Sequence, residues 1–252
     1  MVDVTLTRDA FLGGKLHLWQ PAQGYRAGVD PVFLAASVQA KQGDRVLELG
    51  CGVGTAMFCL GARVPDLALT GVERDAATAD LARRNAQDNG LTAQIITSDL
   101  AALPPEVKAQ TFDHVLANPP YFKRSRSIPS PHATREAAMG EQTPLSVWVE
   151  VAAKRLAPKG TLTMIQSAAR LPELLGAVSL ALGSVRLRAL QPREGRPAQL
   201  VLVQARKGGR ADFVHLPPLI LHQGPKHERD GESYRAEISS ILRSGTALPW
   251  ES

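Results

Sequence analysis

The fold of this chain is decided by the stretch Arg45-Val46-Leu47-Glu48-Leu49-Gly50-Cys51-Gly52-Val53-Gly54. Its first five residues are mostly apolar and predict a short buried strand, while its three glycines let the backbone turn sharply and approach a ligand closely. The next segment, 55–64, has the composition of a helix, whose N-terminus offers free N–H donors. A nicotinamide-binding loop carries a glycine at its sixth position, which here is Thr55. The stretch therefore predicts a strand, a ligand-binding turn and a helix, with a ligand of another kind.

Short apolar strands alternate with helices downstream of that stretch. Strands are predicted at 67–73, 93–99, 112–118, 160–166, 185–191 and 199–205, and helices at 75–90, 143–157 and 171–182. This alternation is typical of β-α-β units, in which right-handed crossovers cover both faces of a parallel sheet. The predicted fold class is therefore α/β, a doubly wound, mostly parallel, Rossmann-like sheet.

The N-terminal part is predicted to be simpler. Residues 1–28 are expected to be irregular, and a helix is expected to follow with Asp30 as its N-cap and Pro31 as its first residue. We expect one structural domain, composed of an N-terminal lead and capping helix (1–40) and the doubly wound domain (41–252). The lead is either a flap over a bound ligand or a covering arm.

Acidic side chains stand at the ends of the second and third predicted strands. Ligands of open α/β sheets bind at the carboxyl ends of the strands, where Glu73 can accept hydrogen bonds from ribose hydroxyls and Asp99 from an adenine amino group. The glycine spacing resembles that of an S-adenosylmethionine loop, so this cofactor is predicted. Glu48 either receives its ammonium group through water or braces the loop. The predicted cofactor-binding residues are Glu48, Gly50, Cys51, Gly52, Gly54, Glu73, Asp99, Asn118 and, near the methionine end, Asp30.

The motif Asn118-Pro119-Pro120-Tyr121 follows the fourth predicted strand and is the predicted catalytic site. An amine on a base, or a carboxamide nitrogen, is a poor nucleophile because its lone pair is delocalised. The Asn118 side-chain oxygen and the Pro119 carbonyl can accept its two hydrogens and direct its remaining side at a methyl group. Pro120 holds Pro119 extended, and the Tyr121 ring offers a face on which a base can stack. The motif predicts methyl transfer to a planar nitrogen.

Composition and charge limit the possible location, cofactors and partners of the protein. The chain has 252 residues, 44% of them hydrophobic, with no run long enough to cross a membrane. Its two cysteines are too few for a disulfide framework or a zinc site, so a cytoplasmic setting and no metal are expected. The net charge is +5, with a basic loop after Tyr121 that is either a solvated face or a contact for RNA phosphates. Its predicted RNA-binding residues are Lys123, Arg124, Arg126 and Arg135, with Tyr121 beside them and His132 between them.

Several motifs occur in the order found in one known family: Phe11–Gly14, Gly24–Asp30, Leu47–Gly54, Asn118–Tyr121, and a late Leu221-His222 segment before Tyr234 and a helix at 238–242. Over nearly its whole length the chain resembles bacterial tRNA N6-adenine methyltransferases that modify the adenine beside the anticodon of a valine tRNA. The resemblance implies a class I fold, whose seven-stranded sheet has an antiparallel last strand, and tRNA as the substrate. Glu48 stands where relatives often carry Asp.

Three other functions stay open at this level. A methyltransferase that modifies a glutamine side chain of a protein release factor uses the same Asn-Pro-Pro-Tyr chemistry, but only about 40 residues precede the glycine loop here, too few for an additional N-terminal domain. A small-molecule O-methyltransferase usually needs a base or a metal, and no suitable cluster is evident. A scaffold that binds cofactor and RNA without catalysis conflicts with the intact Asn118 and Tyr121. The sequence does not fix the nucleotide, the tRNA or the oligomeric state.

Overall fold

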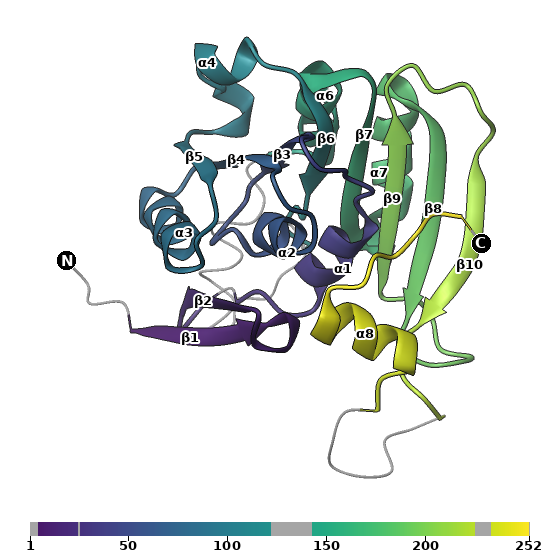
Figure 1. Cartoon of the computed structure of the whole chain (residues 1–252). Helices are drawn as coiled ribbons and strands as arrows, with labels where there is room; N and C mark the ends of the chain where they lie inside the picture. Colours follow the sequence, from purple (N-terminus) through teal and green to yellow (C-terminus); the bar gives the residue numbers. More distant parts are fainter. Residues whose placement is uncertain (1–4, 25, 122–142, 225–232, 252) are drawn as a thin grey trace, which may run out of the picture.

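The centre of the fold is a twisted sheet of eight strands (Figure 1). The computed structural model describes residues 5–24, 26–121, 143–224 and 233–251. The order across the sheet is β10-β8-β9-β7-β6-β3-β4-β5. The strands are β3 (Arg45–Leu49), β4 (Ala68–Glu73), β5 (Ala93–Thr97), β6 (Phe112–Ala117), β7 (Leu156–Ser167), β8 (Gly183–Gln191), β9 (Leu200–Arg206) and β10 (Val214–Ile220).

Seven of these strands form the predicted doubly wound sheet. Strands β5, β4, β3, β6 and β7 pair in parallel, and β9, the last of the seven, runs antiparallel to both β7 and β8. The fold class is confirmed, and β10 adds an eighth strand parallel to β8 that was not predicted. Its sequence contains Pro217 and Pro218, which lack an N–H, and the pairing is interrupted between Leu216 and Leu219. An edge strand tolerates such residues because one side makes no ladder.

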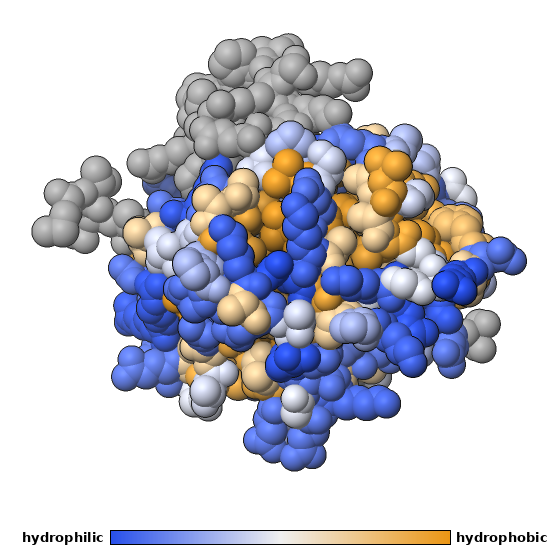
Figure 2. Space-filling model, turned by 90° about the horizontal axis from the view of Figure 1, so that it is seen from above, coloured by the Kyte–Doolittle hydropathy of each residue, from blue (hydrophilic) through white to orange (hydrophobic). Residues whose placement is uncertain are grey.

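The side of the sheet on which the parallel strands begin differs in its surroundings from the side on which they end. The parallel strands end on the lower side of Figure 1, where the N-terminal hairpin and α8 (Ala236–Ser244) also lie. We call this side the carboxyl edge and the opposite side the amino edge. Figure 2 looks onto the amino edge, where apolar patches lie among hydrophilic side chains. The carboxyl edge is the side on which a fold of this class binds ligands.

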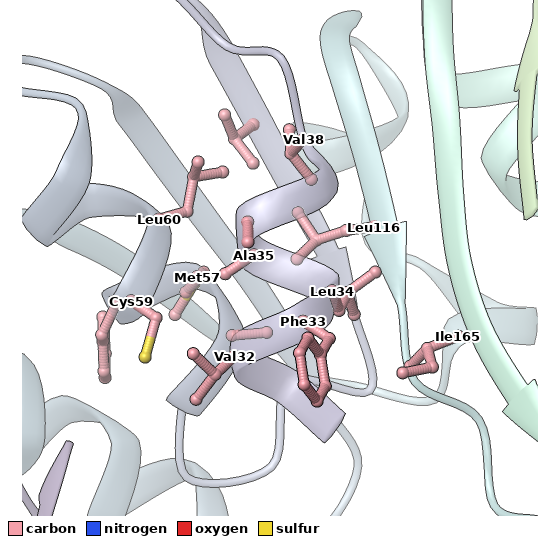
Figure 3. Packing of buried hydrophobic residues seen from close by; sticks show 14 of the residues in the cluster. Val32, Phe33, Leu34, Ala35, Val38, Met57, Cys59, Leu60, Leu116 and Ile165 are labelled. Carbon is pink, nitrogen blue, oxygen red and sulfur yellow. The ribbon is translucent and has the colours of Figure 1, made fainter. Parts of the chain in front are cut away.

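Helices cover both faces of the sheet, each over its own apolar core. One face carries α1 (Asp30–Ser37), α2 (Thr55–Arg63) and α3 (Ala76–Asp88), and Figure 3 shows how Phe33 and Leu34 of α1 pack with Met57 of α2 and Leu116 of β6. The other face carries α6 (Leu145–Arg155) and α7 (Leu171–Ala181). The short helical turns are η1 (Leu12–Gly14), η2 (Leu100–Ala102), α4 (Pro105–Lys108) and η4 (Ala168–Arg170).

The N-terminal lead is not irregular, so that prediction was wrong. Strands β1 (Leu6–Phe11) and β2 (Leu16–Pro21) form an antiparallel hairpin separate from the main sheet. The signal was the alternation in β2, where Leu16, Leu18 and Gln20 point inward and are at most 2% exposed. Two carboxamides of α3 then hold β2 as a neighbouring strand would.

Those carboxamides belong to Asn85 of α3 and to Asn89, the C-cap residue of that helix one turn later. Asn89 accepts from the N–H of His17 and donates to its carbonyl, at 2.9 Å in both directions. Asn85 does the same with Trp19, at 2.7 and 3.1 Å, and also donates to the carbonyl of Val53 at 3.0 Å. Asn85 therefore joins the N-terminal hairpin to the glycine loop.

The predicted helix after the lead is confirmed as α1, but Asp30 does not cap it. Val29 is the N-cap, and Asp30 is the first helical residue, with Pro31 next. No side chain caps this helix end. The Asp30 carboxylate is engaged elsewhere, as described below.

Candidate active site

The predicted site residues come together because their strands are neighbours. The glycine loop follows β3, Glu73 ends β4, Asp99 follows β5 and Asn118 follows β6. These four strands are adjacent in the order β5-β4-β3-β6 and all run in the same direction. Their carboxyl ends therefore form one continuous rim, with the Asn-Pro-Pro-Tyr turn on one side of the glycine loop and the two acidic residues on the other.

The glycine loop needs its glycines for two different reasons. Gly50, Gly52 and Gly54 have φ angles of 62°, 53° and 88°, a region that disfavours other residues. A β-carbon at Gly50 would also lie 2.5 Å from the Trp148 ring, and one at Gly54 would lie 2.1 Å from the Phe58 ring. A β-carbon at Gly52 would meet nothing within 4 Å. Gly52 is thus the point of the loop where a ligand can approach the backbone.

Glu73 fixes the shape of this loop. Its carboxylate accepts a hydrogen bond from the backbone N–H of Gly52 and another from that of Asp75, each at 3.0 Å. A carboxylate has about four lone-pair sites, so two such bonds leave room for further donors. Asp99 is exposed and accepts from the N–H of Ala101 at 2.8 Å, which opens the short turn η2. Both acids are held by backbone groups in the positions the sequence predicted.

Glu48 and Cys51 lie beneath the loop. Glu48 is only 3% exposed and accepts from the N–H of Met57 at 3.0 Å, the contact expected of a brace. Burial raises the pKa of Glu48 to about 8, helped by the nearby charge of Glu73 and opposed by the bond from Met57. The Cys51 side chain packs in the core, where a β-carbon on Gly71 would lie 2.8 Å from its sulfur, and burial raises its pKa well above the ordinary range. Only the backbone of Cys51 is therefore placed to reach a ligand.

The Asn-Pro-Pro-Tyr turn is held by side chains from distant parts of the chain. The buried side chain of Gln166 donates to the Pro119 carbonyl at 3.2 Å, and Arg170 donates to the Pro120 carbonyl at 3.0 Å. The Tyr121 hydroxyl donates to the Asp30 carboxylate at 2.7 Å. The contact that the structure shows for Asp30 is thus with the Asn-Pro-Pro-Tyr turn, and its predicted contact with the cofactor stays a prediction.

Sequence reasoning did not identify Gln166, Arg170 or Asn85 as part of the site, and no local motif marks the first two. The predicted basic residues Lys123, Arg124, Arg126 and Arg135, with His132, lie outside the residues that the structure describes. Among the described residues, no group of three His, Cys, Asp or Glu side chains could hold a metal ion. No helix in the same part of the chain is long and apolar enough to span a membrane.

Comparison with known proteins agrees with this geometry. The sequence model of the family described as "Methyltransferase small domain" matches residues 28–180, which run from just before α1 through the glycine loop and the Asn-Pro-Pro-Tyr turn into α7. The chain belongs to this family. It is therefore an S-adenosylmethionine-dependent methyltransferase with a class I fold.

Relatives of this methyltransferase match most of its length. A protein of Porphyromonas gingivalis is 27% identical over 94% of this chain and 99% of its own length. One of Actinobacillus succinogenes is 28% identical over 79% of this chain and 84% of its own. Both bear the name tRNA1(Val) (adenine(37)-N6)-methyltransferase.

Solved structures show the same fold. A predicted O-methyltransferase from Agrobacterium tumefaciens superposes with a TM-score of 0.71 at 24% identity, covering 87% of this methyltransferase and 98% of that chain. A T. thermophilus 16S rRNA N2 G1207 methyltransferase, solved with AdoMet and guanosine, gives a TM-score of 0.58 at 21% identity, covering 81% of this chain and 50% of that one. These likenesses concern the fold alone.

Proposed function

We propose that this methyltransferase transfers a methyl group from S-adenosylmethionine to the N6 amino group of an adenine in tRNA. The observation that carries the proposal is the Asn-Pro-Pro-Tyr turn at the end of β6, beside the glycine loop of β3. The names of the relatives from P. gingivalis and A. succinogenes support adenine in tRNA as the target. Such a substrate also supports a cytoplasmic setting.

The carboxyl edge fits the proposed cofactor. The open side of Gly52 admits a ligand against the backbone, and Glu73 beside it has lone pairs for two ribose hydroxyls. Asp99, exposed at the end of the next strand, can accept from an adenine amino group. Gly50, Gly54 and the Cys51 backbone shape the turn, the buried Glu48 lies beneath it, and Asp30 accepts from Tyr121 of the neighbouring turn. The bound cofactor supplies an electrophilic methyl group on a sulfonium sulfur.

The residues of this chain bind and orient the nucleophile. The Asn118 side-chain oxygen and the Pro119 carbonyl accept the two hydrogens of the target amine, and the Tyr121 ring stacks on the base. Such positioning by fixed acceptors accounts for most of the catalysis, because the alkylated amine loses its proton readily. The basic residues that follow Tyr121 would contact tRNA phosphates.

The experiment is a transfer assay with labelled S-adenosylmethionine and bulk tRNA from a strain that lacks the gene. We expect label in tRNA and, after digestion, a single modified nucleoside, N6-methyladenosine. Asn118→Ala is the matched control and should give none. Label in another nucleoside would reject adenine N6, and label in a folded release factor but not in tRNA would favour the glutamine-modifying function.

A further inference from the structure

The two proline carbonyls of the catalytic turn are held by one segment of the chain. Strand β7 lies next to β6 (Figure 1). Gln166 stands near the end of β7, and Arg170 ends the short turn η4 four residues later. Gln166 donates to the Pro119 carbonyl at 3.2 Å and Arg170 to the Pro120 carbonyl at 3.0 Å. The segment 166–170 thus holds two successive carbonyl groups of the turn by hydrogen bonds.

The side chains of Gln166 and Arg170 are both buried, and further contacts fix their orientation. Gln166 is fully buried, and its side-chain oxygen accepts from the N–H of Ser167 at 2.7 Å, which fixes the amide so that its nitrogen faces Pro119. Arg170 is 8% exposed and pairs with Glu173 at 2.8 Å. A buried polar side chain that is satisfied at both ends has little freedom to move, so each holds its carbonyl in one direction.

A carbonyl oxygen has two lone pairs. The bond from Gln166 uses one of those on Pro119, and the second is left for the substrate. The direction of that second lone pair decides whether the target amine meets the Asn118 oxygen and the Pro119 oxygen together. Pro119 fixes its own φ angle and Pro120 keeps its ψ angle extended, but that extended range still spans about 40°, so the bond from Gln166 selects one carbonyl direction within it.

We propose that Gln166 and Arg170 are positioning residues for methyl transfer. Gln166 directs the Pro119 carbonyl at the amine, and Arg170 holds the next carbonyl so that the turn keeps its shape when the base enters. Because Glu173 balances its charge, Arg170 adds geometry without adding a net positive charge beside the amine. The assignment rests on the proposed function, since it takes a planar amine as the group to be held.

The test compares Gln166→Met and Gln166→Glu with the wild-type enzyme. Gln166→Met keeps the length of the side chain and removes the donor. We expect kcat to fall by about tenfold to a hundredfold, as misplaced reacting groups do, with little change in KM for tRNA or in cofactor affinity. An unchanged kcat in a folded Gln166→Met protein would overturn the proposal.

Gln166→Glu separates positioning from mere support of the fold. A protonated carboxyl can donate to the Pro119 carbonyl, whereas the ionised form would repel it. Activity of Gln166→Glu should therefore rise as the pH is lowered, relative to the wild-type enzyme. A purely structural role predicts instead a pH-dependent loss of stability, seen in a thermal melt, while kcat per folded enzyme follows the wild-type pH profile. This readout also decides the question if Gln166→Met fails to fold, because a pH profile parallel to wild type would then overturn the proposal.

Arg170 has a matched control in Arg155, the last residue of α6, which donates to the carbonyls of Val107 and Lys108 in α4. Arg170→Met should lower kcat about tenfold, and Arg170→Lys should recover part of it. Arg155→Met should affect stability alone. Equal kcat losses in both Met variants would mean that loss of an arginine–carbonyl bond acts through general stability, which would overturn the role of Arg170.

These results are distinguishable from failure of the proposed function. The nucleoside produced by the wild-type enzyme decides whether adenine N6 is the target. The Gln166 variants are compared on whatever amine the wild-type enzyme methylates. If the wild-type enzyme produces a different nucleoside and the variants show the expected kcat loss and pH profile, the adenine assignment is rejected and the positioning role is kept. If the wild-type enzyme produces N6-methyladenosine and the variants have unchanged kcat and pH profile, the adenine assignment is kept and the positioning role is rejected.

Discussion

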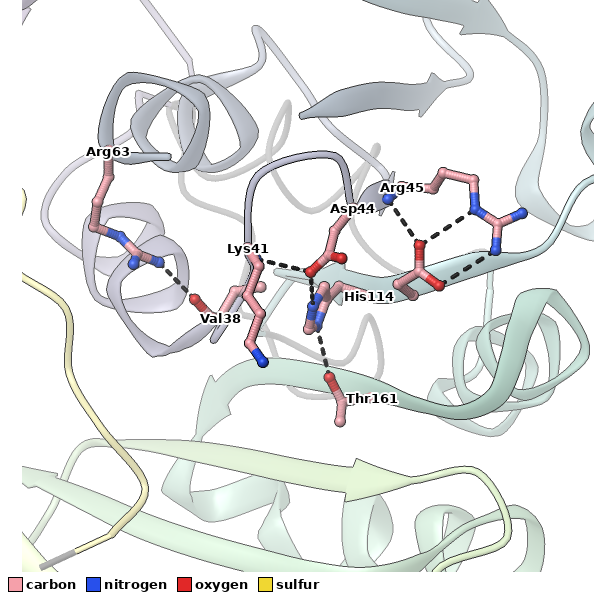
Figure 4. Close-up of polar contacts among 8 residues, drawn as sticks. Val38, Lys41, Asp44, Arg45, Arg63, His114 and Thr161 are labelled. Atoms are coloured by element: carbon pink, nitrogen blue, oxygen red, sulfur yellow. Dashed lines mark hydrogen bonds and ion pairs between the residues drawn. The ribbon is translucent and has the colours of Figure 1, made fainter. Parts of the chain in front are cut away.

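The amino and carboxyl edges of the sheet use the same residue types in different ways. At the amino edge, the His114 ring lies between the Asp44 carboxylate, at 3.1 Å, and the Thr161 hydroxyl, at 2.9 Å (Figure 4). At the carboxyl edge, Glu73 and Asp99 bind backbone N–H groups of the turns beside them. At the amino edge, contacts between side chains tie the strands together, in addition to the bond that Asp44 accepts from the backbone of Lys41. At the carboxyl edge, the bonds that the structure shows for Glu73 and Asp99 are with turn backbone alone, so these acids shape the turns where a ligand can bind.

The amino edge shows why residue type alone is a poor guide to function. An Asp-His-Thr series resembles a proton relay, yet each ring nitrogen of His114 faces a neighbour from an adjacent part of the sheet, and Asp44 also accepts from the N–H of Lys41 at 2.8 Å. Nearby, burial would raise the pKa of Asp113, but hydrogen bonds from the Arg45 side chain and backbone outweigh it and lower the pKa. This edge is a closed network that holds the starts of the strands.

The largest effect is expected at the Asn-Pro-Pro-Tyr turn. Asn118→Ala removes an acceptor for the target amine, so turnover should fall by more than about a hundredfold, a barrier increase above roughly 2.7 kcal/mol. Cofactor affinity, measured by calorimetry, should change little because the lost contact concerns the substrate. Activity within about tenfold of wild type would show that the turn does not position the amine.

A smaller effect is expected at the rim acids. Glu73→Ala should weaken cofactor binding by about 1–3 kcal/mol, since charge-assisted bonds to ribose are lost and the Gly52 N–H loses its partner. Calorimetry and a thermal melt on the same sample separate affinity from stability. Unchanged affinity in the folded variant would contradict the ribose assignment.

The third prediction concerns tRNA binding by the basic residues that follow Tyr121 in the sequence. Replacing Lys123, Arg124 and Arg126 together with Ala should weaken tRNA binding and flatten its dependence on salt, because fewer counterions are released. Cofactor affinity should stay the same. A salt titration measures both properties of tRNA binding, and identical slopes for wild type and variant would mean that the loop is only solvated. Absent or salt-independent binding by the wild type would remove tRNA from the proposal.

The buried Glu48 is expected to make the free energy of unfolding depend on pH. Its pKa is about 8 in the fold, above the ordinary value of 4.5, so between these pH values the folded chain binds more protons at this site than the unfolded chain. The free energy of unfolding should therefore fall as the pH rises through this window. Glu48→Gln mimics the protonated group and should remove that slope, gaining roughly 1–4 kcal/mol near pH 8 relative to wild type. A parallel pH dependence in wild type and variant would contradict it.

The same variant separates the two roles predicted for Glu48. If Glu48 only braces α2 through Met57, Glu48→Gln should bind the cofactor as wild type does, because the amide oxygen still accepts that bond. If Glu48 receives the ammonium group through water, the affinity should fall.

The sequence predicted those parts of the site whose residues lie within a local motif or at the end of a predicted strand. The glycine loop, Glu73, Asp99 and the Asn-Pro-Pro-Tyr turn are all consecutive or lie at strand ends, so periodicity and topology alone bring them to one edge. The hairpin was missed although β2 alternates without interruption, because its glycine-rich surroundings were interpreted as irregular, and β10 was missed because Pro217 and Pro218 interrupt its pattern. Gln166 and Arg170 lie 47 and 50 residues from the carbonyls they hold. Contacts of that kind leave no local signal, because they depend on which strands become neighbours.

The smallest effect is expected at the amino edge, and it tests the comparison most directly. His114→Leu removes two side-chain bonds from a ring whose side chain is only 12% exposed, and it leaves Asp44 without one of its donors, so the free energy of unfolding should fall by about 1–2 kcal/mol. Asp44→Asn should lower the free energy of unfolding by a similar amount, and the double variant should lower it by less than the sum, because both residues belong to one network.

Values of kcat and cofactor affinity, measured well below the melting temperature, should match wild type, because no residue of this network contacts the glycine loop or the Asn-Pro-Pro-Tyr turn in the contacts described. Thr161→Val, which removes only the outer partner of the ring, serves as the milder control. A loss of kcat in His114→Leu with an intact fold would mean that the amino edge takes part in the chemistry, and the division between a structural and a functional edge would then have to be abandoned.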